Sequence, residues 1–527
     1  MKLLPSPLHT PHSLPALLAL CAAAFAAPAA YAAPPSAAPD AAAVARDRAR
    51  SIRLPASDVH GRAVRSYVEN TPDSDYIHAS ETAHEAFRDI KFSVRIIWGV
   101  YSQWGIEASW PFLYMPAQKR MAYQELYKTF NPVDFDAEEW MSLFKRGGAQ
   151  GFAFITKHHD GFSLFHTKTR VKRRANFLAP PDKLIEDCDI AYSVQDTPFK
   201  RDIVKELCDA GHRHGLKIDL YYSHSDWYDA DFRPYSFHPL ITRHSQKNRL
   251  DYGNGIRNDK HNILTPERTP EETARMTARH REQLKELLTN YGKIDMICFD
   301  MWLGKDVWPQ TKETIKILRK LQPDVMFRAR GIGNYGDYFQ PETFIPKNPE
   351  NTNMPWMGID VLAKVFAYSP NAKDYKDGAW IVKKLIEAVA KGGSFMVSFG
   401  PDTKGRFHPK VVEALEATGR WLKVNGEGIY NTRATPKGDW KKGQHRLTRS
   451  KDGKSIYIFV QTWPGREVSI PSVTAANVGE IKMLGYEKPL SWSNDEKGGI
   501  KIAIPEALQS PANRPCEYAW CFKLKIK

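Results

Sequence analysis

The chain has 527 residues and a formal net charge of +15, and about 490 residues remain once an N-terminal export segment is set aside, which predicts two large domains. Its six cysteines show neither the spacing of a metal site nor the density of a disulfide scaffold, which excludes both classes. The basic charge favours anionic partners, which for an exported protein are polysaccharides or cell surfaces rather than nucleic acid.

The N-terminus has the pattern of a signal peptide. Lys2 precedes an apolar, alanine-rich run over 14–27, and Ala-Tyr-Ala at 30–32 supplies the small residues of a cleavage site. A membrane anchor is the alternative, but the run is shorter than the ~20 residues of a spanning helix. We therefore expect residues 1–32 to be removed on export to the periplasm or the medium. Residues 33–60 are expected to form a flexible linker, and the mature protein is not expected to insert stably into a membrane.

From about residue 90, short β-prone runs alternate with amphipathic stretches, which predicts parallel βαβ units. The predicted strands are 93–100, 151–157, 217–223, 294–300, 325–330 and 394–400. The predicted helices are 137–147, 199–214, 273–291, 311–321, 381–391 and 411–424. Six strands within about 310 residues fit an eight-stranded barrel with two strands unplaced better than an open doubly wound sheet. We assign residues 61–430 to this barrel.

After the last predicted helix, the pattern changes to short alternating runs separated by Gly, Pro and Asn turns. Such runs are typical of an antiparallel β-domain. The chain is therefore predicted to be an α/β protein with a (β/α)8-like TIM barrel, followed by a C-terminal antiparallel β-sandwich over 431–527. This second domain either binds sugar or packs against the barrel, and we expect packing because an extended apolar face must be buried.

Polar residues follow the predicted strands, where TIM barrels carry their active sites. Asp300 ends an apolar strand and has two interpretations, a catalytic carboxylate and a structural, salt-bridged one. His158 and His159 indicate either sugar binding or a metal site, but adjacent residues on a strand point to opposite faces, so we expect no metal. Glycoside hydrolysis needs two carboxyl groups, and Glu342 and Glu350 are the candidates for the second.

Several motifs occur in one order over about residues 85–435. They include Trp98-Gly99-Val100-Tyr101-Ser102, Lys157-His158-His159-Asp160-Gly161-Phe162, Leu220-Tyr221-Tyr222-Ser223, Phe299-Asp300, Gly336-Asp337-Tyr338 with Pro341-Glu342, and Lys391-Gly392-Gly393. In this order they resemble glycoside hydrolase family 29, the α-L-fucosidases. The resemblance implies a barrel with a β-sandwich behind it. It also implies retaining exo-hydrolysis of terminal α-L-fucose through a covalent glycosyl-enzyme, without a cofactor.

The resemblance also implies roles for individual residues. Asp300 occupies the nucleophile position, and Glu342 matches an acid/base, whose pKa we expect to be raised by a closed, apolar site. The positions implied to bind the sugar are His158, His159, Trp110, Tyr222, Arg330 and Trp356.

The chain also departs from the family pattern. Ile97 stands where the family has a histidine, Ser109 where it has a glutamate, Cys298 where it has an aromatic residue, and Met357 where other members have their acid/base. A lost hydroxyl partner typically costs about 1–3 kcal/mol, which is enough to change the preferred sugar. The alternatives are therefore an α-L-galactosidase of the same mechanism and a non-catalytic carbohydrate-binding barrel. A metal hydrolase that uses His158, His159 and Asp160 is a third alternative.

The expected partner is an oligosaccharide or polysaccharide. An anionic glycan is one option because of the basic cluster at 168–174, although a solvated charged loop is the simpler interpretation.

Overall fold

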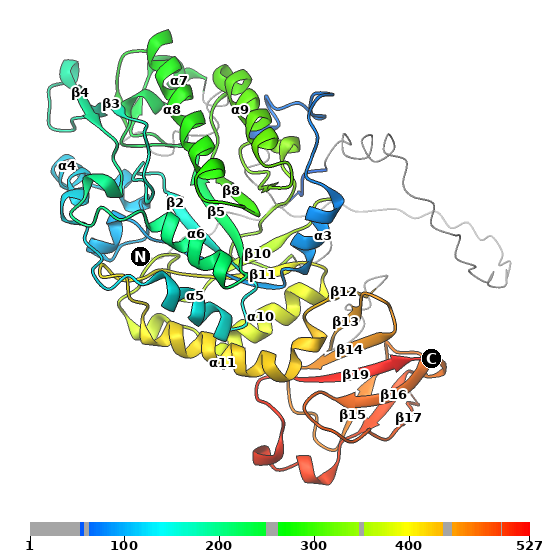
Figure 1. Ribbon diagram of the computed structural model, residues 1–527. Coiled ribbons are helices and arrows are strands. Elements are labelled where there is room, and N and C mark those ends of the chain that lie inside the picture. Colours follow the sequence, from blue (N-terminus) through cyan, green and yellow to red (C-terminus); the bar gives the residue numbers. More distant parts are fainter. Residues whose placement is uncertain (1–52, 57–62, 249–261, 347–351, 436–444, 497) are drawn as a thin grey trace, which may run out of the picture. The chain divides into compact units, whose positions relative to one another are not determined.

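Figure 1 shows the computed structural model of the protein. The structure describes residues 53–56, 63–248, 262–346, 352–435, 445–496 and 498–527. Within these residues, no helix is long and apolar enough to cross a membrane. The predicted signal peptide, and the predicted linker apart from residues 53–56, lie outside the described residues.

A parallel sheet of seven strands forms most of a barrel wall, in the order β10-β11-β1-β2-β5-β8-β9. Their bounds are β1 Phe92–Ile96, β2 Gly151–Lys157, β5 Lys217–Ser223, β8 Met296–Asp300, β9 Met326–Phe327, β10 Met357–Val361 and β11 Ser394–Phe399. Each strand lies beside the next barrel strand in the chain, except β9 and β10, which are the two ends of the sheet, and β11 returns to β1, as expected for a (β/α) barrel. All six predicted strands are present.

The segment 338–342 closes the barrel between β9 and β10. On one side, Ala329 N donates to Tyr338 O at 2.9 Å, and on the other, Ile359 N donates to Pro341 O at 2.8 Å. Parallel bridges join Tyr338 to Arg328 and Glu342 to Ile359. This segment and β10 are the two strands that the sequence did not locate. Pro341 removes a ladder donor from one, and Gly358 and Asp360 interrupt the apolar pattern of the other.

Helices cover the outside of the barrel, and all six predicted helices are present with ends that differ by at most four residues. The helices are α3 Glu81–Asp89, α4 Ala117–Gln124, α5 Ala137–Arg146, α6 Ile203–Arg213, α7 Arg243–Lys247, α8 Pro270–Thr289, α9 Trp308–Leu321, α10 Gly378–Ala390 and α11 Pro409–Asn425. Polar caps define where they begin. The Asp136 and Asp202 side chains accept from the third amide of α5 and α6, and Thr269 forms a capping box with Glu272 in α8.

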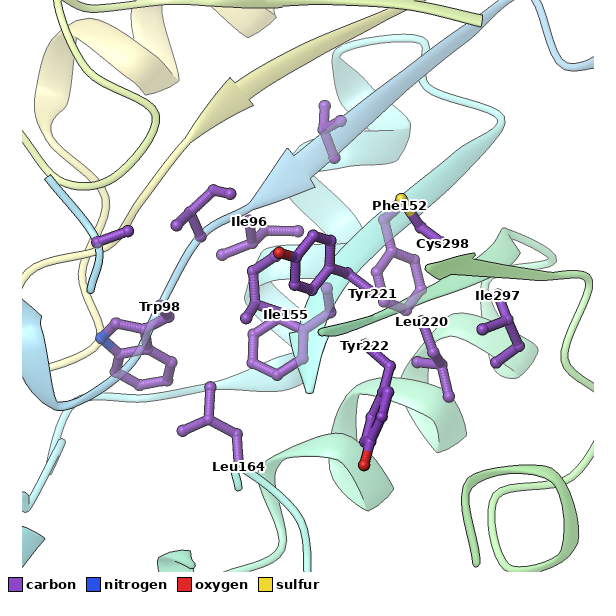
Figure 2. Packing of buried hydrophobic residues seen from close by; sticks show 14 of the residues in the cluster. Ile96, Trp98, Phe152, Ile155, Leu164, Leu220, Tyr221, Tyr222, Ile297 and Cys298 are labelled. Carbon is purple, nitrogen blue, oxygen red and sulfur yellow. The ribbon is translucent and has the colours of Figure 1, made fainter. Parts of the chain in front are cut away.

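The core lies between the strands and these helices, and Figure 2 shows part of it, with Ile96, Phe152, Leu220 and Ile297 from four neighbouring strands. All four side chains are completely buried. Strands that are buried on both faces have near-continuous apolar sequences, which is why the sequence located most of them.

The C-terminal domain is antiparallel, as predicted. Its first sheet has the order β12-β13-β14-β19-β16 and its second the order β15-β18-β17. The strands are β12 Thr432–Ala434, β13 Arg446–Ser450, β14 Ser455–Val460, β15 Glu467–Ile470, β16 Val478–Met483, β17 Trp492–Asn494, β18 Ile500–Ala503 and β19 Trp520–Ile526. Tyr457 and Phe459 belong to the same buried cluster as the barrel residues, so part of this domain packs against the barrel.

Two small sheets lie in loops that follow barrel strands. They are formed by β3 Val171–Ala175 with β4 Ile185–Ile190, and by β6 Leu240–Ile241 with β7 Ile263–Leu264.

Candidate active site

Asp300 is the last residue of β8 and lies at the carboxyl end of the barrel strands. Its Oδ2 accepts a hydrogen bond from the Tyr221 hydroxyl at 2.6 Å, and its Oδ1 accepts one from Arg330 Nη1 at 2.8 Å. The amide of Met301 also donates to Oδ1, at 2.9 Å. The side chain is 11% exposed. The carboxylate is therefore held from three directions.

These contacts control the charge of Asp300. Burial works against the ionised form, but the guanidinium groups of Arg330 and Arg328 favour it, and the Tyr221 hydrogen bond adds to them, so the pKa of Asp300 lies well below its usual range. Asp300 is therefore ionised at neutral pH, as a carboxylate nucleophile must be.

Glu342 ends the closing segment 338–342 and shares an arginine with Asp300. Glu342 Oε1 accepts from Arg330 Nη1 at 3.0 Å, and the same nitrogen donates to Asp300 Oδ1 at 2.8 Å. These two distances place the two oxygens no more than about 6 Å apart. Carboxyl groups lie about 5–5.5 Å apart in retaining glycosidases and about 6.5–9.5 Å apart in inverting ones. The spacing therefore fits a retaining pair.

The expectation that the pKa of Glu342 is raised is wrong for this structure. Burial raises the pKa of this carboxyl, but Arg330 and Arg328 outweigh burial and lower it. Arg328 Nη2 donates to Glu342 Oε1 at 2.8 Å, in addition to the bond from Arg330. The sequence predicted an apolar surrounding, whereas two cations face this carboxylate.

The two histidines lie side by side near Asp300. Their ring centres are 4.1 Å apart, because β2 ends at Lys157 and both residues follow it, outside the strand alternation. His158 Nδ1 pairs with the Ser109 hydroxyl at 2.5 Å, and His159 Nδ1 with the Ser223 hydroxyl at 2.5 Å. His159 Nε2 lies 3.8 Å from Asp300 Oδ2.

Burial lowers the pKa of both histidines, to about 4 for His159 and well below the usual range for His158. They are neutral at pH 7 and suited to hydrogen bonding with sugar hydroxyls. Across the described part of the chain, no group of three or more His, Cys, Asp or Glu side chains is arranged to hold a metal ion.

An aromatic wall stands beside His159. The ring centre of Trp110 is 4.8 Å from that of His159, 5.6 Å from Trp227 and 5.8 Å from Phe237. Sequence reasoning had selected only Trp110. Phe237 follows Ser236, and both have left-handed backbones, with φ of 64° and 50°. Such conformations are costly for side chains other than glycine and gather at functional sites, but only a structure reveals them.

The prediction for Tyr222 selected the wrong one of two adjacent tyrosines. The Tyr222 hydroxyl donates to Gln283 of α8 at 2.9 Å, on the outer face of β5, whereas Tyr221 contacts Asp300 inside the barrel. Figure 2 shows the two rings pointing apart. Successive side chains of a strand alternate between its faces, so an error of one residue changes the face.

We expect Tyr221→Phe to lower kcat/KM at least about tenfold, because a hydrogen bond to a charged group contributes about 1.5–3 kcal/mol. The matched control is Tyr222→Phe, which removes a hydroxyl from the same strand without touching Asp300. Steady-state kinetics on an aryl α-L-fucoside, the substrate class that the family resemblance implies, compares the two variants, together with their thermal unfolding. Equal kinetic losses in both variants would contradict the assignment of Tyr221.

Trp356 does not lie in this site. It immediately precedes β10, at the amino end of the barrel, and lines a hollow there with Lys391 and Gly392. Met357, which follows it, is completely buried and accepts from the Ser93 hydroxyl at 3.2 Å. Met357 therefore does not mark a lost acid at the carboxyl end, where Glu342 lies.

The other departures from the family pattern are packed side chains. Ile97 is 4% exposed, and Ser109 and Cys298 are completely buried. Ser109 is bonded to His158, and Cys298 lies 2.9 Å from a guanidinium nitrogen of Arg95. Each of these three positions is therefore occupied by a side chain that packs against its neighbours.

The geometry agrees with comparisons to known proteins. A family model for α-L-fucosidase matches residues 61–427, and a model for the α-L-fucosidase C-terminal domain matches residues 439–525. The chain is 26% identical over 491 residues to the tissue α-L-fucosidase of Homo sapiens, covering 87% of this chain and 92% of that one.

Solved structures show the same fold. α-L-fucosidase isoenzyme 1 from Paenibacillus thiaminolyticus superposes with a TM-score of 0.67 at 25% identity, covering 85% of this chain and 99% of that one. A GH29 α-L-fucosidase from Bacteroides thetaiotaomicron gives a TM-score of 0.65 at 24% identity, covering 85% and 96%. Because the α-L-fucosidase family model matches residues 61–427, well over half of this protein, the chain belongs to the α-L-fucosidase family of glycoside hydrolases.

Proposed function

We propose that this protein hydrolyses terminal α-L-fucosides with net retention, with Asp300 as the nucleophile and Glu342 as the acid/base. The observation that carries the proposal is that both carboxylates bond to the same nitrogen of Arg330, at 2.8 and 3.0 Å. This spacing suits a nucleophile and a proton donor on one anomeric centre.

The chemistry proceeds in two displacements. Asp300 attacks the anomeric carbon while Glu342 donates a proton to the departing oxygen, and the bond between that carbon and oxygen breaks. Glu342, now ionised, takes a proton from water, which attacks the anomeric carbon and releases Asp300. Each displacement inverts the configuration, so the product retains it. The neutral histidines and the Trp110 ring are placed to bind the hydroxyls and the apolar face of the sugar.

Release of nitrophenol from the aryl α-L-fucoside and the aryl α-L-galactoside tests this function. We expect turnover of the fucoside and much slower turnover of the galactoside, because Ile97, Ser109 and Cys298, which replace larger or more polar residues of the family, are buried and packed. Faster turnover of the galactoside would establish the L-galactosidase instead. Binding of fucose without turnover of either substrate would establish the non-catalytic barrel.

We propose a neutral glycan as the substrate. Four of the five cations of the basic cluster at 168–174 are paired with carboxylates, which leaves little charge for an anionic chain. The pairs are Arg170 and Lys172 with Asp189, Arg173 with Glu272, and Arg174 with Glu125 and Glu186. The signal-peptide pattern at 1–32 supports export, so we place this activity in the periplasm or the medium.

The activity should decline as the pH rises through neutrality. Catalysis needs Asp300 ionised and Glu342 protonated, and the two arginines lower the pKa of Glu342. Above that pKa, the protonated fraction falls about tenfold for each pH unit. We therefore expect kcat/KM for phenyl α-L-fucoside, a substrate with a poor leaving group, to be highest at acidic pH. A pH profile that is flat or rising through neutrality would contradict the assignment of Glu342.

A further inference from the structure

A second polar layer lies in the barrel directly beneath the catalytic pair. Side chains alternate along a strand, so the residues two positions before each group of the site point into the barrel one step deeper. They are Cys298 on β8, Arg328 after β9 and Gln340 on the closing segment, which are 0%, 1% and 4% exposed. TIM-barrel interiors are usually filled with branched apolar side chains. A buried polar layer at this depth therefore calls for a function.

Arg95 enters this layer from the opposite wall. It lies on β1, which is paired with β2 and β11 and not with β8, so its contact with β8 crosses the barrel interior. Arg95 Nη2 lies 2.5 Å from Gln340 Oε1 and 2.9 Å from Cys298 Sγ. Its guanidinium carbon lies 5.5 Å from the ring centre of Tyr221, and the residue is 2% exposed.

We propose that Arg95 is a positioning residue of the hydrolysis, which holds Gln340, and with it Glu342, at the correct height beside Asp300. The inference rests on the proposed function. Its tests compare the rates on two substrates with different leaving groups, so that the positioning role and the proposed function can fail separately.

The closing segment 338–342 is the part of the barrel wall that most needs such support. It is joined to its neighbours by single bridges instead of a regular ladder, and Pro341 lacks an amide donor. Gln340 is held from both sides, because its side-chain oxygen accepts from Arg95 and its main-chain oxygen accepts from Arg328 at 3.3 Å. Two residues further on, the same segment ends in the Glu342 carboxylate.

Arg95 contacts the nucleophile side of the site as well. Cys298 precedes Asp300 by two positions on β8, and Tyr221 donates its hydroxyl to Asp300. Arg95 touches both of these residues. One guanidinium therefore connects the strands that carry the two catalytic carboxylates.

Charge is balanced across the two layers. The charged groups that face Glu342 are Arg328 and Arg330 beside β9, Arg95 on β1 and Asp300 on β8. The other titratable groups near Arg95 are His158, Asp219, Tyr221, Cys298 and Tyr338. Asp219 is completely buried, and burial raises its pKa to about 6, although Arg95, Arg328 and a hydrogen bond from the Cys298 backbone oppose this. Arg95 is one of the two cations that compensate it.

The first test is Gln340→Met, which removes the acceptor of Arg95 without changing any charge. The probes are phenyl α-L-fucoside, which needs a proton donor, and α-L-fucosyl fluoride, which needs one far less. A misplacement of a catalytic group by about 1 Å costs about 10²-fold in rate. If Glu342 is displaced, we therefore expect a loss of that size on the phenyl fucoside and a loss below about tenfold on the fluoride. Equal losses on both substrates would overturn the proposal.

The second test compares Arg95→Lys with Arg95→Met. Lysine keeps the charge but not the planar fork, so Arg95→Lys should show the same leaving-group dependence as Gln340→Met with an unchanged pH profile. Arg95→Met also removes a positive charge near Glu342, so the decline of kcat/KM should move to higher pH by about one unit. An unchanged profile in Arg95→Met, with both substrates affected equally, would assign Arg95 to stability alone.

The matched control is Arg233→Met. Arg233 is also 2% exposed and ion-paired, to Glu272 at 2.8 Å, but it contacts neither catalytic carboxylate. The Arg233→Met substitution should lower the unfolding temperature without creating a leaving-group dependence of the rate. If it creates the same dependence, the effect of Arg95 is a general consequence of removing a buried cation, and the proposal fails. Absence of turnover in the unmodified protein would instead refute the proposed function.

Discussion

Asp300→Ala should abolish turnover of aryl α-L-fucosides, with a loss of at least about 10⁴-fold in kcat, because the covalent intermediate has no nucleophile left to form it. Azide added to the variant should restore turnover of α-L-fucosyl fluoride, since a small anion fits the volume of the missing carboxylate. The product should be the β-fucosyl azide, because a single displacement inverts the configuration.

The matched control for Asp300 is Asp360→Ala. Asp360 lies on β10, is 7% exposed and forms an ion pair with Lys384 at 2.8 Å. The Asp360→Ala variant should be less stable than the unmodified protein and keep its activity within a small factor. Full activity of Asp300→Ala, or an α-fucosyl azide from it, would contradict the assignment of the nucleophile.

Glu342→Gln should separate substrates by their leaving groups. General acid catalysis contributes about 10²–10⁴-fold, so we expect a loss in that range on phenyl α-L-fucoside and a much smaller loss on α-L-fucosyl fluoride. Azide should accelerate the variant by attacking the glycosyl-enzyme, and the product should be the α-fucosyl azide. Measuring both rates and the anomer of the azide by NMR checks each step.

Glu107 provides the control for Glu342, because it is a glutamate whose pKa suits a proton donor. It lies on the loop after β1 and accepts from the Phe366 amide at 3.1 Å, and burial raises its pKa to about 7. Glu107→Gln should lower the rate on both substrates similarly or not at all. A leaving-group dependence in Glu107→Gln and none in Glu342→Gln would move the acid/base role to Glu107.

The parts of the fold that the sequence predicted are those set by local patterns. The strands β2 and β5 match the predicted bounds because each is a short apolar run between a turn and a polar motif. The closing segment was missed because Pro341 and a set of polar residues interrupt any alternation. Its strand-like pairing depends on residues in and beside β9 and β10, and the local sequence pattern of the segment does not show that these residues are its neighbours in space.

The candidate site shows the same division. Asp300 and the histidines could be identified because Asp300 ends one strand and the histidines follow another, and the carboxyl ends of both strands were predicted correctly. The choice between Tyr221 and Tyr222 requires knowing which residues of β5 face the barrel interior. A shift of one residue in the register exchanges the two faces of the strand. The charge state of Glu342 depends on Arg328 and Arg330, and only tertiary structure shows that both guanidinium groups face one carboxylate.

The most direct test of a retaining mechanism at Asp300 is to trap the intermediate. The mature protein is incubated with 2-deoxy-2-fluoro-α-L-fucosyl fluoride, and the intact mass and the labelled peptide are determined by mass spectrometry. We predict one added fluorofucosyl group per chain, attached to Asp300, and no label in Asp300→Ala. Turnover of fucosides without any trapped adduct, or a label on another residue, would contradict this mechanism.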